Sequence, residues 1–513
     1  MRLTLVLAAV IALMLGDATA QAGRGQESMF QDDNELVYVP RKELRRNLDT
    51  LQSLGVDRLR ITVLWKLVAP ASGSRDRPER FDATDPGAYP RDAWDRYDAI
   101  VQEAAARGLK VNFNITGPSP LWANERAPRE DIVETFEPSD VEYSAFVVAV
   151  GRRYSGTWPA TGGGTLPRVS YWSVWNEPNQ SGWLTPQWSA DSRTAFARGA
   201  SLYRELLDGA WAALQATGHG EDTILIGETA PKGDRSRGIK RQIEMMTFFR
   251  ALYCVDGRYR ALRGAAAVKL GCPSDPRRFR ELHPALFSAS GYAHHPYELI
   301  LPPSFKPLRP EWVTIANLGR LTRGLDRVFR RYGSRRRLPI YLTEYGYQTN
   351  PPDPTGVPLA RQALYLNQSE YMSWRNPRVR TLSQFLLVDD DPAVPASFQS
   401  GLIRRGSGSR KPSFGAYRLP VWLPRPSVRR GRAVRVWALL RPAVNGLPAT
   451  AEIQHRPRGS KRWRRVKRVT TRDRRNYLMT SVRVRRSGHL RVRFTPPGRS
   501  TPVSSRAAAV RIR

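Results

Sequence analysis

From Ser28 to Val388 the chain repeats one pattern: a short apolar run rich in β-branched and aromatic residues, then a longer amphipathic stretch. The stretch Arg41 to Leu54 shows the second part, with leucines three and four residues apart and Gly55 at its end. Such alternation predicts strands of a parallel sheet joined by helices. Eight strands are expected, in the segments 28–33, 56–65, 109–115, 169–175, 223–228, 285–297, 338–347 and 381–388.

Eight such units predict a closed (β/α)₈ barrel, the TIM-barrel architecture, with long loops at one mouth. Helices are expected at 41–54, 91–107, 141–154, 190–217, about 239–253, 312–332 and 359–374. An open, doubly wound sheet is the alternative. It would need a glycine-rich phosphate turn after its first strand, which this sequence lacks.

Two of the expected strands end in a glutamate. The run ValSerTyrTrpSerValTrp is followed by Asn176, Glu177 and Pro178, and the run LeuProIleTyrLeuThr is followed by Glu344. Carboxylates at the carboxyl ends of barrel strands meet at the mouth of the barrel. A pair about 5–5.5 Å apart serves a retaining glycosidase as acid and nucleophile. The sequence therefore predicts Glu177 and Glu344 as a catalytic pair.

The motifs TrpAsnGluProAsn (175–179) and TyrLeuThrGluTyrGlyTyr (341–347), at the ends of the fourth and seventh strands, resemble the clan A glycoside hydrolases. This group includes the family 5 cellulases and the family 39 xylosidases. The resemblance covers roughly residues 30–418. It implies that Glu177 is the general acid/base, that Glu344 is the nucleophile, and that Asn176 binds the sugar 2-hydroxyl.

Three further residues match the same pattern. Arg60 resembles the arginine that holds the nucleophile charged, since an opposite charge within about 4–6 Å lowers a carboxyl pKa by about 1–3 units. His295 and Tyr297 resemble the His-x-Tyr of the sixth strand, in which the tyrosine hydroxyl contacts the nucleophile. A structural ion pair for Arg60 and a loop position for His295 are the alternatives.

Two residues near the predicted site are expected to have no catalytic role. His294 is expected in a loop. Glu228 also ends a strand, the fifth, and is expected to be a structural or a subsite carboxylate.

Tryptophans gather near the predicted strand ends, where flat aromatic faces suit sugar rings. Trp175, Trp122 and Trp183 are expected to bind substrate, whereas Trp172 lies inside a strand and is expected in the core. One feature departs from the family pattern. No tryptophan follows the eighth strand to lie under the cleaved sugar, and Phe398 is the candidate substitute.

The first residues have the form of a secretory signal peptide. Arg2 precedes an apolar run of about 13 residues, short of the roughly 20 needed to span a membrane, and small residues then offer cleavage after Ala20 or Ala22. We expect a signal peptide at 1–20, a linker at 21–29, and a secreted, monomeric protein. In an oxidising compartment Cys254 and Cys272 are expected to form a disulfide. By closing a loop it would stabilise the folded state by on the order of 3 kcal/mol. A two-thiolate metal site is the alternative.

The basic charge is concentrated at the C-terminal end. Of the net charge of +36, residues 421–513 contribute +24, from 26 lysines and arginines against two acidic residues. Short strands alternate apolar and basic residues there, as at Arg432 to Leu440 and His489 to Phe494, which predicts a β-sandwich of immunoglobulin or fibronectin type at 420–513, after a barrel at 30–419. The basic runs, among them 461–468 and 471–475, either contact an anionic polymer such as a cell-wall polymer, or form a solvated face.

Together these features predict a secreted retaining glycoside hydrolase that acts on a β-linked carbohydrate. No metal-ligand spacing and no phosphate-binding glycine loop occurs, so hydrolysis without a metal or cofactor is expected. One alternative is a non-catalytic glycan-binding protein. Another makes the basic domain the functional part and the barrel its scaffold.

Overall fold

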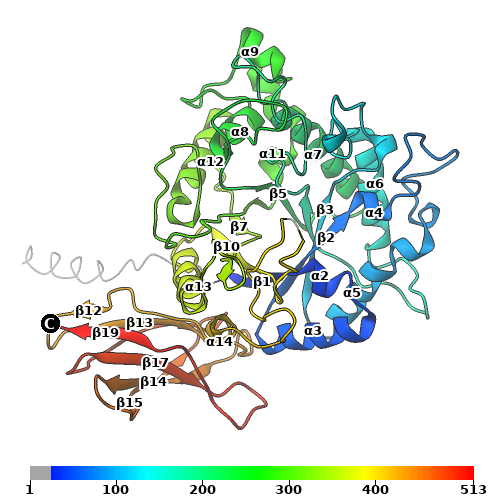
Figure 1. Cartoon of the computed structure of the whole chain (residues 1–513). Helices are drawn as coiled ribbons and strands as arrows, with labels where there is room; N and C mark the ends of the chain where they lie inside the picture. The colour runs from blue at the N-terminus through cyan, green and yellow to red at the C-terminus, as the bar shows by residue number, and fades with distance from the viewer. Residues whose placement is uncertain (1–24, 395) are drawn as a thin grey trace, which may run out of the picture.

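The computed structural model describes residues 25–394 and 396–513. Eight parallel strands close into a barrel, each paired with its neighbours in chain order (Figure 1). The barrel strands are β1 (Glu27–Gln31), β2 (Arg58–Leu64), β3 (Lys110–Thr116), β4 (Tyr171–Val174), β5 (Thr223–Thr229), β6 (Gly291–His294), β7 (Ile340–Leu342) and β10 (Val379–Phe385). The predicted (β/α)₈ barrel is confirmed. The two-residue strands β8 (Thr349–Asn350) and β9 (Val357–Pro358) form a separate small sheet.

Helices surround the barrel because each has one apolar stripe to bury against the strands. In α3, for example, Leu44, Leu48 and Leu51 are buried while the arginines between them are not. The longer helices are α3 (Arg41–Ser53), α5 (Asp95–Ala105), α6 (Asp140–Arg153), α7 (Arg198–Ala216), α8 (Met245–Leu252), α12 (Gly319–Arg331) and α13 (Leu359–Trp374). Shorter ones are α2 (Asp33–Leu36), α4 (Trp65–Val68), α9 (Gly264–Lys269), α10 (Phe279–Leu282), α11 (Ala285–Ser288) and α14 (Pro412–Arg418). No helix of the described residues combines the length and apolar character needed to cross a bilayer.

Two predicted elements are shorter than expected. Helix α7 begins at Arg198 instead of residue 190. The Ser192 hydroxyl accepts from the Thr194 N–H in a turn, and Asp191 accepts from the distant Ile239 N–H. The run at 285–297 divides into the helix α11 and the strand β6, since a short apolar run suits either structure.

The barrel begins earlier than predicted. Strand β1 starts at Glu27, inside the segment 21–29 that was assigned to a linker. Its polar residues are fixed by partners distant in sequence: Glu27 pairs with Arg58, and the Ser28 N–H donates to Asp57 at 2.8 Å. The predicted signal peptide and its cleavage sites lie outside the described residues.

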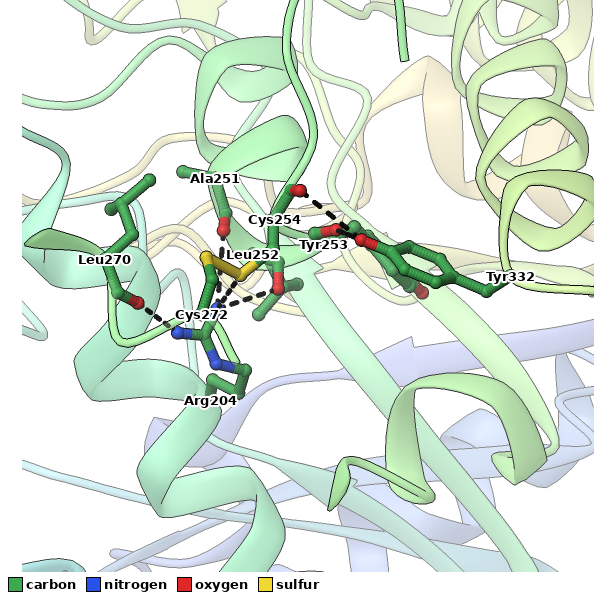
Figure 2. The surroundings of a disulfide bond; sticks show 8 residues. All are labelled: Arg204, Ala251, Leu252, Tyr253, Cys254, Leu270, Cys272 and Tyr332. Atoms are coloured by element: carbon green, nitrogen blue, oxygen red, sulfur yellow. Dashed lines mark hydrogen bonds between the residues drawn. A yellow bond between two sulfur atoms is a disulfide. The ribbon is translucent and has the colours of Figure 1, made fainter. Parts of the chain in front are cut away.

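The disulfide between Cys254 and Cys272 is formed and closes the segment after α8 (Figure 2). Beneath it lies the buried Arg204, whose guanidinium donates to the backbone carbonyls of Leu252 and Leu270. These carbonyls end short helices and lack helical partners of their own, so the arginine satisfies them. Burial lowers the pKa of Arg204 to about 10.

The C-terminal residues form two sheets that enclose one apolar core, including Val436, Ile453 and Val492. The smaller sheet contains β11 (Val421–Trp422), β13 (Val434–Leu439) and β16 (Tyr477–Val482). The larger contains β12 (Ser427–Val428), β19 (Ala508–Ile512), β17 (Gly488–Phe494), β14 (Ala449–Pro457) and β15 (Arg464–Thr471), with β18 (Val503–Ser504) beside β17. The additional all-β region predicted from the sequence is therefore present.

The sandwich is packed firmly against the barrel. Trp437, on the outer face of the smaller sheet, is fully buried against Tyr371 and Trp374 of α13. Arg475, within a run predicted to be part of a basic surface, instead forms ion pairs with Glu27 and Asp57 at the amino ends of barrel strands. Figure 1 shows β14, β15 and β17 on the side of the sandwich away from the barrel.

Arg441 is the central ionic contact of this interface. It donates to Glu370 of α13 at 2.9 Å and to the Ser28 hydroxyl at 2.6 Å, and only 5% of its side chain and 7% of that of Glu370 are exposed. Its guanidinium carbon also lies 4.0 Å from the centre of the Tyr417 ring. Both charges of this pair are therefore withdrawn from water and depend on each other.

We predict that Arg441→Ala lowers the free energy of unfolding by about 3–5 kcal/mol, because it leaves the Glu370 carboxylate buried without a cation. Urea denaturation followed by tryptophan fluorescence measures the change. The exposed Arg429 provides the control, and Arg429→Ala should change stability by less than about 0.5 kcal/mol. Equal effects of the two substitutions would contradict the prediction.

Candidate active site

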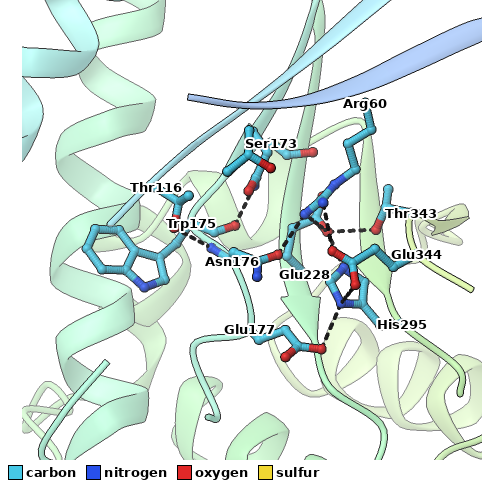
Figure 3. A network of polar contacts seen from close by, with 12 residues as sticks. Arg60, Thr116, Ser173, Trp175, Asn176, Glu177, Glu228, His295, Thr343 and Glu344 are labelled. Carbon is cyan, nitrogen blue, oxygen red and sulfur yellow. Dashed lines mark hydrogen bonds and ion pairs between the residues drawn. The ribbon is translucent and has the colours of Figure 1, made fainter. Parts of the chain in front are cut away.

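Six polar side chains meet at the carboxyl ends of the barrel strands and form the candidate site (Figure 3). One comes from within β2, one from β5, and the others lie within three residues of the ends of β4, β6 and β7. They are Arg60, Asn176, Glu177, Glu228, His295 and Glu344.

Arg60 is fully buried and holds the network together. Its Nη1 donates to Glu344 at 2.9 Å and to Gln31 at 2.5 Å. Its Nη2 donates to the Asn176 amide oxygen at 2.7 Å and to Glu228 at 3.1 Å. Because Arg60 occupies the amide oxygen, a ligand would meet the NH₂ end of Asn176.

His295 is equally buried and lies among three carboxylates. Its Nε2 is 2.8 Å from Glu228, and its Nδ1 is 2.9 Å from Glu177 and 3.4 Å from Glu344. Burial opposes the charge of the ring, but Glu344 and the hydrogen bonds to Glu177 and Glu228 outweigh it and raise the pKa of His295 to about 10. The imidazolium form, with an N–H on each nitrogen, fits three acceptors. His295 follows the end of β6, and its side chain is fully buried within the cluster.

Solvent exposure separates the three glutamates. The side chains of Glu177 and Glu344 are 20% and 12% exposed, whereas that of Glu228 is fully buried. Burial would raise the pKa of Glu228, but Arg60 and His295 lower it to about 2. Glu228 is therefore a fixed internal anion and cannot be a subsite contact.

Glu344 has the contacts predicted for it, with a different net effect on its pKa. Arg60 donates to one oxygen and the Tyr297 hydroxyl to the other, at 3.2 Å. Burial is the largest influence and, with the nearby charges of Glu177 and Glu228, raises the pKa of Glu344 despite the opposing effects of His295 and Arg60. Arg60 thus lowers this pKa as expected, but it does not determine the net direction.

One oxygen of Glu177, one oxygen of Glu344 and one nitrogen of His295 all lie within 4.8 Å of one another. Such a set of donors could in principle hold a metal ion. A histidine ligand must be deprotonated, whereas the carboxylates around His295 favour its charged form.

The backbone is strained where the site is built. Trp175, Glu177 and Glu228 have φ angles of 61°, 37° and 44°, in the left-handed region that residues with a side chain rarely adopt. The Glu177 N–H donates to the Glu228 carbonyl at 2.9 Å, which couples the two strained segments. Strain of this kind concentrates at functional sites.

The assignment of Trp175 to substrate binding is wrong. Its left-handed backbone turns the indole away from the mouth, and the side chain is fully buried. The ring packs edge-on against Tyr143 and donates from Nε1 to the Trp183 carbonyl at 3.2 Å. It also fills the space beside Gly117, where an added Cβ would lie 2.8 Å from the indole.

The other tryptophans differ in their environments. Trp122 is half-buried against Trp65, its Nε1 donates to a loop carbonyl, and none of the hydrogen bonds or aromatic contacts of the described residues joins it to the carboxylates. Trp183 is also half-buried, and the core position predicted for Trp172 is confirmed. Phe398 lies near the end of the eighth strand, 37% exposed and edge-on to Phe385.

His294 does not lie in a loop. It ends β6 and is buried, with its Nε2 2.9 Å from the Val313 carbonyl and its Nδ1 3.0 Å from the Thr229 hydroxyl. Burial lowers its pKa to about 3, which favours a neutral His294 beside a positively charged His295. Several contributors were not predicted: Gln31 holds Arg60, Thr343 donates to Glu228 at 2.6 Å, and the Thr116 hydroxyl accepts from the Asn176 N–H. Their position as polar residues at strand ends was the available signal.

A scan against protein-family models finds no match, and a search of the curated proteins finds none. Solved structures with a similar arrangement include a family 39 glycoside hydrolase from Bacteroides cellulosilyticus WH2 (15% identity, 90% of this chain and 80% of that chain covered, TM-score 0.46). Others are a β-glycosidase from Thermosphaera aggregans (17%, 73% and 83%, 0.43) and a β-glucosidase from Thermotoga maritima (14%, 74% and 85%, 0.45). At these identities and TM-scores the superpositions assign no role to any residue.

We predict that Glu228→Gln lowers the pKa of His295 from about 10, because the amide keeps a hydrogen-bond acceptor but removes one of the anions that stabilise the imidazolium. A titration followed by the NMR signals of the imidazole nitrogens measures it. Glu298→Gln is the control, since Glu298 is also buried but pairs with Lys232. An unchanged His295 pKa in Glu228→Gln would show that Glu228 does not stabilise the ring.

Proposed function

We propose that this protein is a retaining glycoside hydrolase in which Glu344 is the nucleophile and Glu177 the general acid/base. The observation that carries the proposal is the pair of solvent-reaching carboxylates with oxygens within 4.8 Å of each other, on strands that end at one mouth. Inverting enzymes keep their carboxyl groups about 6.5–9.5 Å apart to admit a water between them, whereas retaining enzymes need about 5–5.5 Å.

The reaction has two displacements. In the first, a Glu344 oxygen attacks the anomeric carbon, the glycosidic C–O bond breaks, and Glu177 gives its proton to the departing oxygen. In the second, Glu177 takes a proton from water, whose oxygen attacks the anomeric carbon and releases Glu344. Over the two steps one water molecule is consumed, and Glu177 is protonated again at the end. The NH₂ group of Asn176 is proposed to bind the sugar 2-hydroxyl.

The buried charges suit this cycle. Two cations, Arg60 and His295, lie among three carboxyl groups. With one of the three carboxyl groups protonated, the cluster is neutral. When Glu344 is esterified to the sugar, Glu177 can ionise and the cluster is neutral again. Because the His295 Nδ1 lies between Glu177 and Glu344, it can serve whichever carboxylate carries the charge.

We propose a β-linked poly- or oligosaccharide as the substrate and export from the cell as the context. The first rests on the resemblance of the two strand-end motifs to clan A hydrolases. The second is supported by the signal-like apolar run and by the disulfide between Cys254 and Cys272. Phe398 is the candidate for the aromatic surface under the cleaved sugar.

The proposal predicts reducing-end release from at least one of a panel of β-glucans, xylans, mannans and galactans, and none with Glu344→Ala. Glu177→Ala should retain turnover of aryl glycosides with good leaving groups, which need no acid, while polysaccharide cleavage falls by about 10²–10⁴-fold. NMR of the first product should show the β-anomer. Binding of one polymer without turnover by the wild type would instead favour the glycan-binding alternative.

The same cluster predicts a pH effect. The charge of Glu228 contributes to the raised pKa of Glu344, so Glu228→Gln should lower that pKa. The acidic limb of the kcat/KM profile, where the nucleophile ionises, should therefore move to lower pH. Glu298→Gln should leave the limb in place. A shift to higher pH in Glu228→Gln would exclude this account of the charges.

A further inference from the structure

The outer face of the larger C-terminal sheet carries a dense group of arginines. Alternate residues of a strand point to opposite faces, and here the inward set, such as Leu490 and Val492 in β17, is buried in the sandwich core. The outward arginines come from four strands. They are Arg456, Arg465, Arg468, Arg491, Arg493 and Arg511, and they define what we call the arginine face.

The strand register places most of these arginines close together. Arg493 and Arg468 lie opposite Glu452 from its two sides, and Arg491 lies opposite Gln454. Neighbouring strands are about 4.8 Å apart and alternate residues along a strand about 7 Å apart, so the guanidinium groups form a two-dimensional array.

Very little negative charge balances the array. Glu452 is the only acidic residue in β14, β15, β17 and β19, and it contacts Arg465 at 3.1 Å and Arg493 at 4.0 Å. The excess of positive charge affects Arg491, because burial together with the charges of Arg493 and Arg456 lowers the pKa of its guanidinium group. The arginines that fix the sandwich to the barrel, Arg441 and Arg475, lie elsewhere and have their own carboxylates.

The aromatic residue of this face is already engaged. Arg491 and Arg456 lie over the ring of Trp463, at 4.3 Å and 5.0 Å from its centre. A protein that binds single-stranded nucleic acid offers free aromatic rings on which bases stack. Here the ring orders two guanidinium groups, which suits recognition by charge and by paired hydrogen bonds to carboxylate or sulfate groups.

We propose that the arginine face is a binding surface for an acidic polysaccharide, a polymer that carries carboxylate or sulfate groups along its length. The face is turned away from the barrel, so a polymer bound there would leave the mouth free (Figure 1). The sandwich is locked to the barrel by buried contacts, so binding would hold the whole protein in a fixed orientation on the polymer.

Dextran sulfate and uncharged dextran are the matched probes, with binding to the full chain measured by titration calorimetry at low and at physiological salt. We expect binding to dextran sulfate that weakens with salt, and none to dextran. Arg468→Gln/Arg493→Gln should raise the Kd about fivefold, whereas Arg335→Gln/Arg337→Gln, which removes the same charge from an exposed barrel loop, should change it less than about twofold.

Glu452→Gln gives the sharper result. It removes the carboxylate that occupies Arg465 and Arg493, so the Kd should fall about threefold, a gain that misfolding would not produce. Equal losses in the two double variants, equal binding of dextran, or a lower Kd for a 20-base-pair DNA duplex than for dextran sulfate would each overturn the proposal. Since dextran is α-linked and no turnover is read, failure here would leave the proposed hydrolase unaffected.

Discussion

The buried guanidinium of Arg60 is the interaction on which the site depends. It sits inside the barrel with no access to water, and a charge in such a place must be paired and hydrogen-bonded. The pairing residues come from the first, fourth, fifth and seventh barrel strands. The arginine thereby fixes the positions of these strand ends relative to each other. Closure of the barrel and the geometry of the site therefore depend on the same contacts.

A second buried cation, His295, links this network to the carboxylates at the solvent-exposed edge of the site. Two cations among three carboxyl groups can be neutral only if one carboxyl is protonated. Arg60 and His295 keep Glu228 ionised despite its full burial, whereas Glu177 and Glu344 reach solvent. Exposure therefore separates the structural Glu228 from the pair that is proposed to react, although all three lie at or near the ends of barrel strands.

The sequence was sufficient to predict the barrel and the meeting of Glu177 and Glu344 at its mouth, because both depend on local rules. Alternating apolar runs identify parallel strands, and a carboxylate at a strand end must lie at the mouth whatever the loops do. Trp175 shows where this reasoning stops. Its position beside Asn176 predicted an exposed side chain. The backbone of Trp175 instead has a left-handed φ, which turns the ring into the core. Only glycine makes such a φ predictable from the residue type. Glu228 shows another limit, since its burial is decided by Arg60 and His295, which are 168 and 67 residues away.

The arginines of the C-terminal region present the same limit in a different form. In the sequence, Arg441 and Arg475 are indistinguishable from Arg468 or Arg493, and all belong to one basic stretch. In the structure the first two are buried against Glu370, Glu27 and Asp57, and they make the sandwich part of the barrel's own stability. Removing the sandwich would expose Trp437's partners on α13, leave Glu370 without its cation and remove Arg475 from Glu27 and Asp57. Loss of activity on truncation would therefore not assign the function to the basic domain, and only substitutions on the outward face can separate binding from folding.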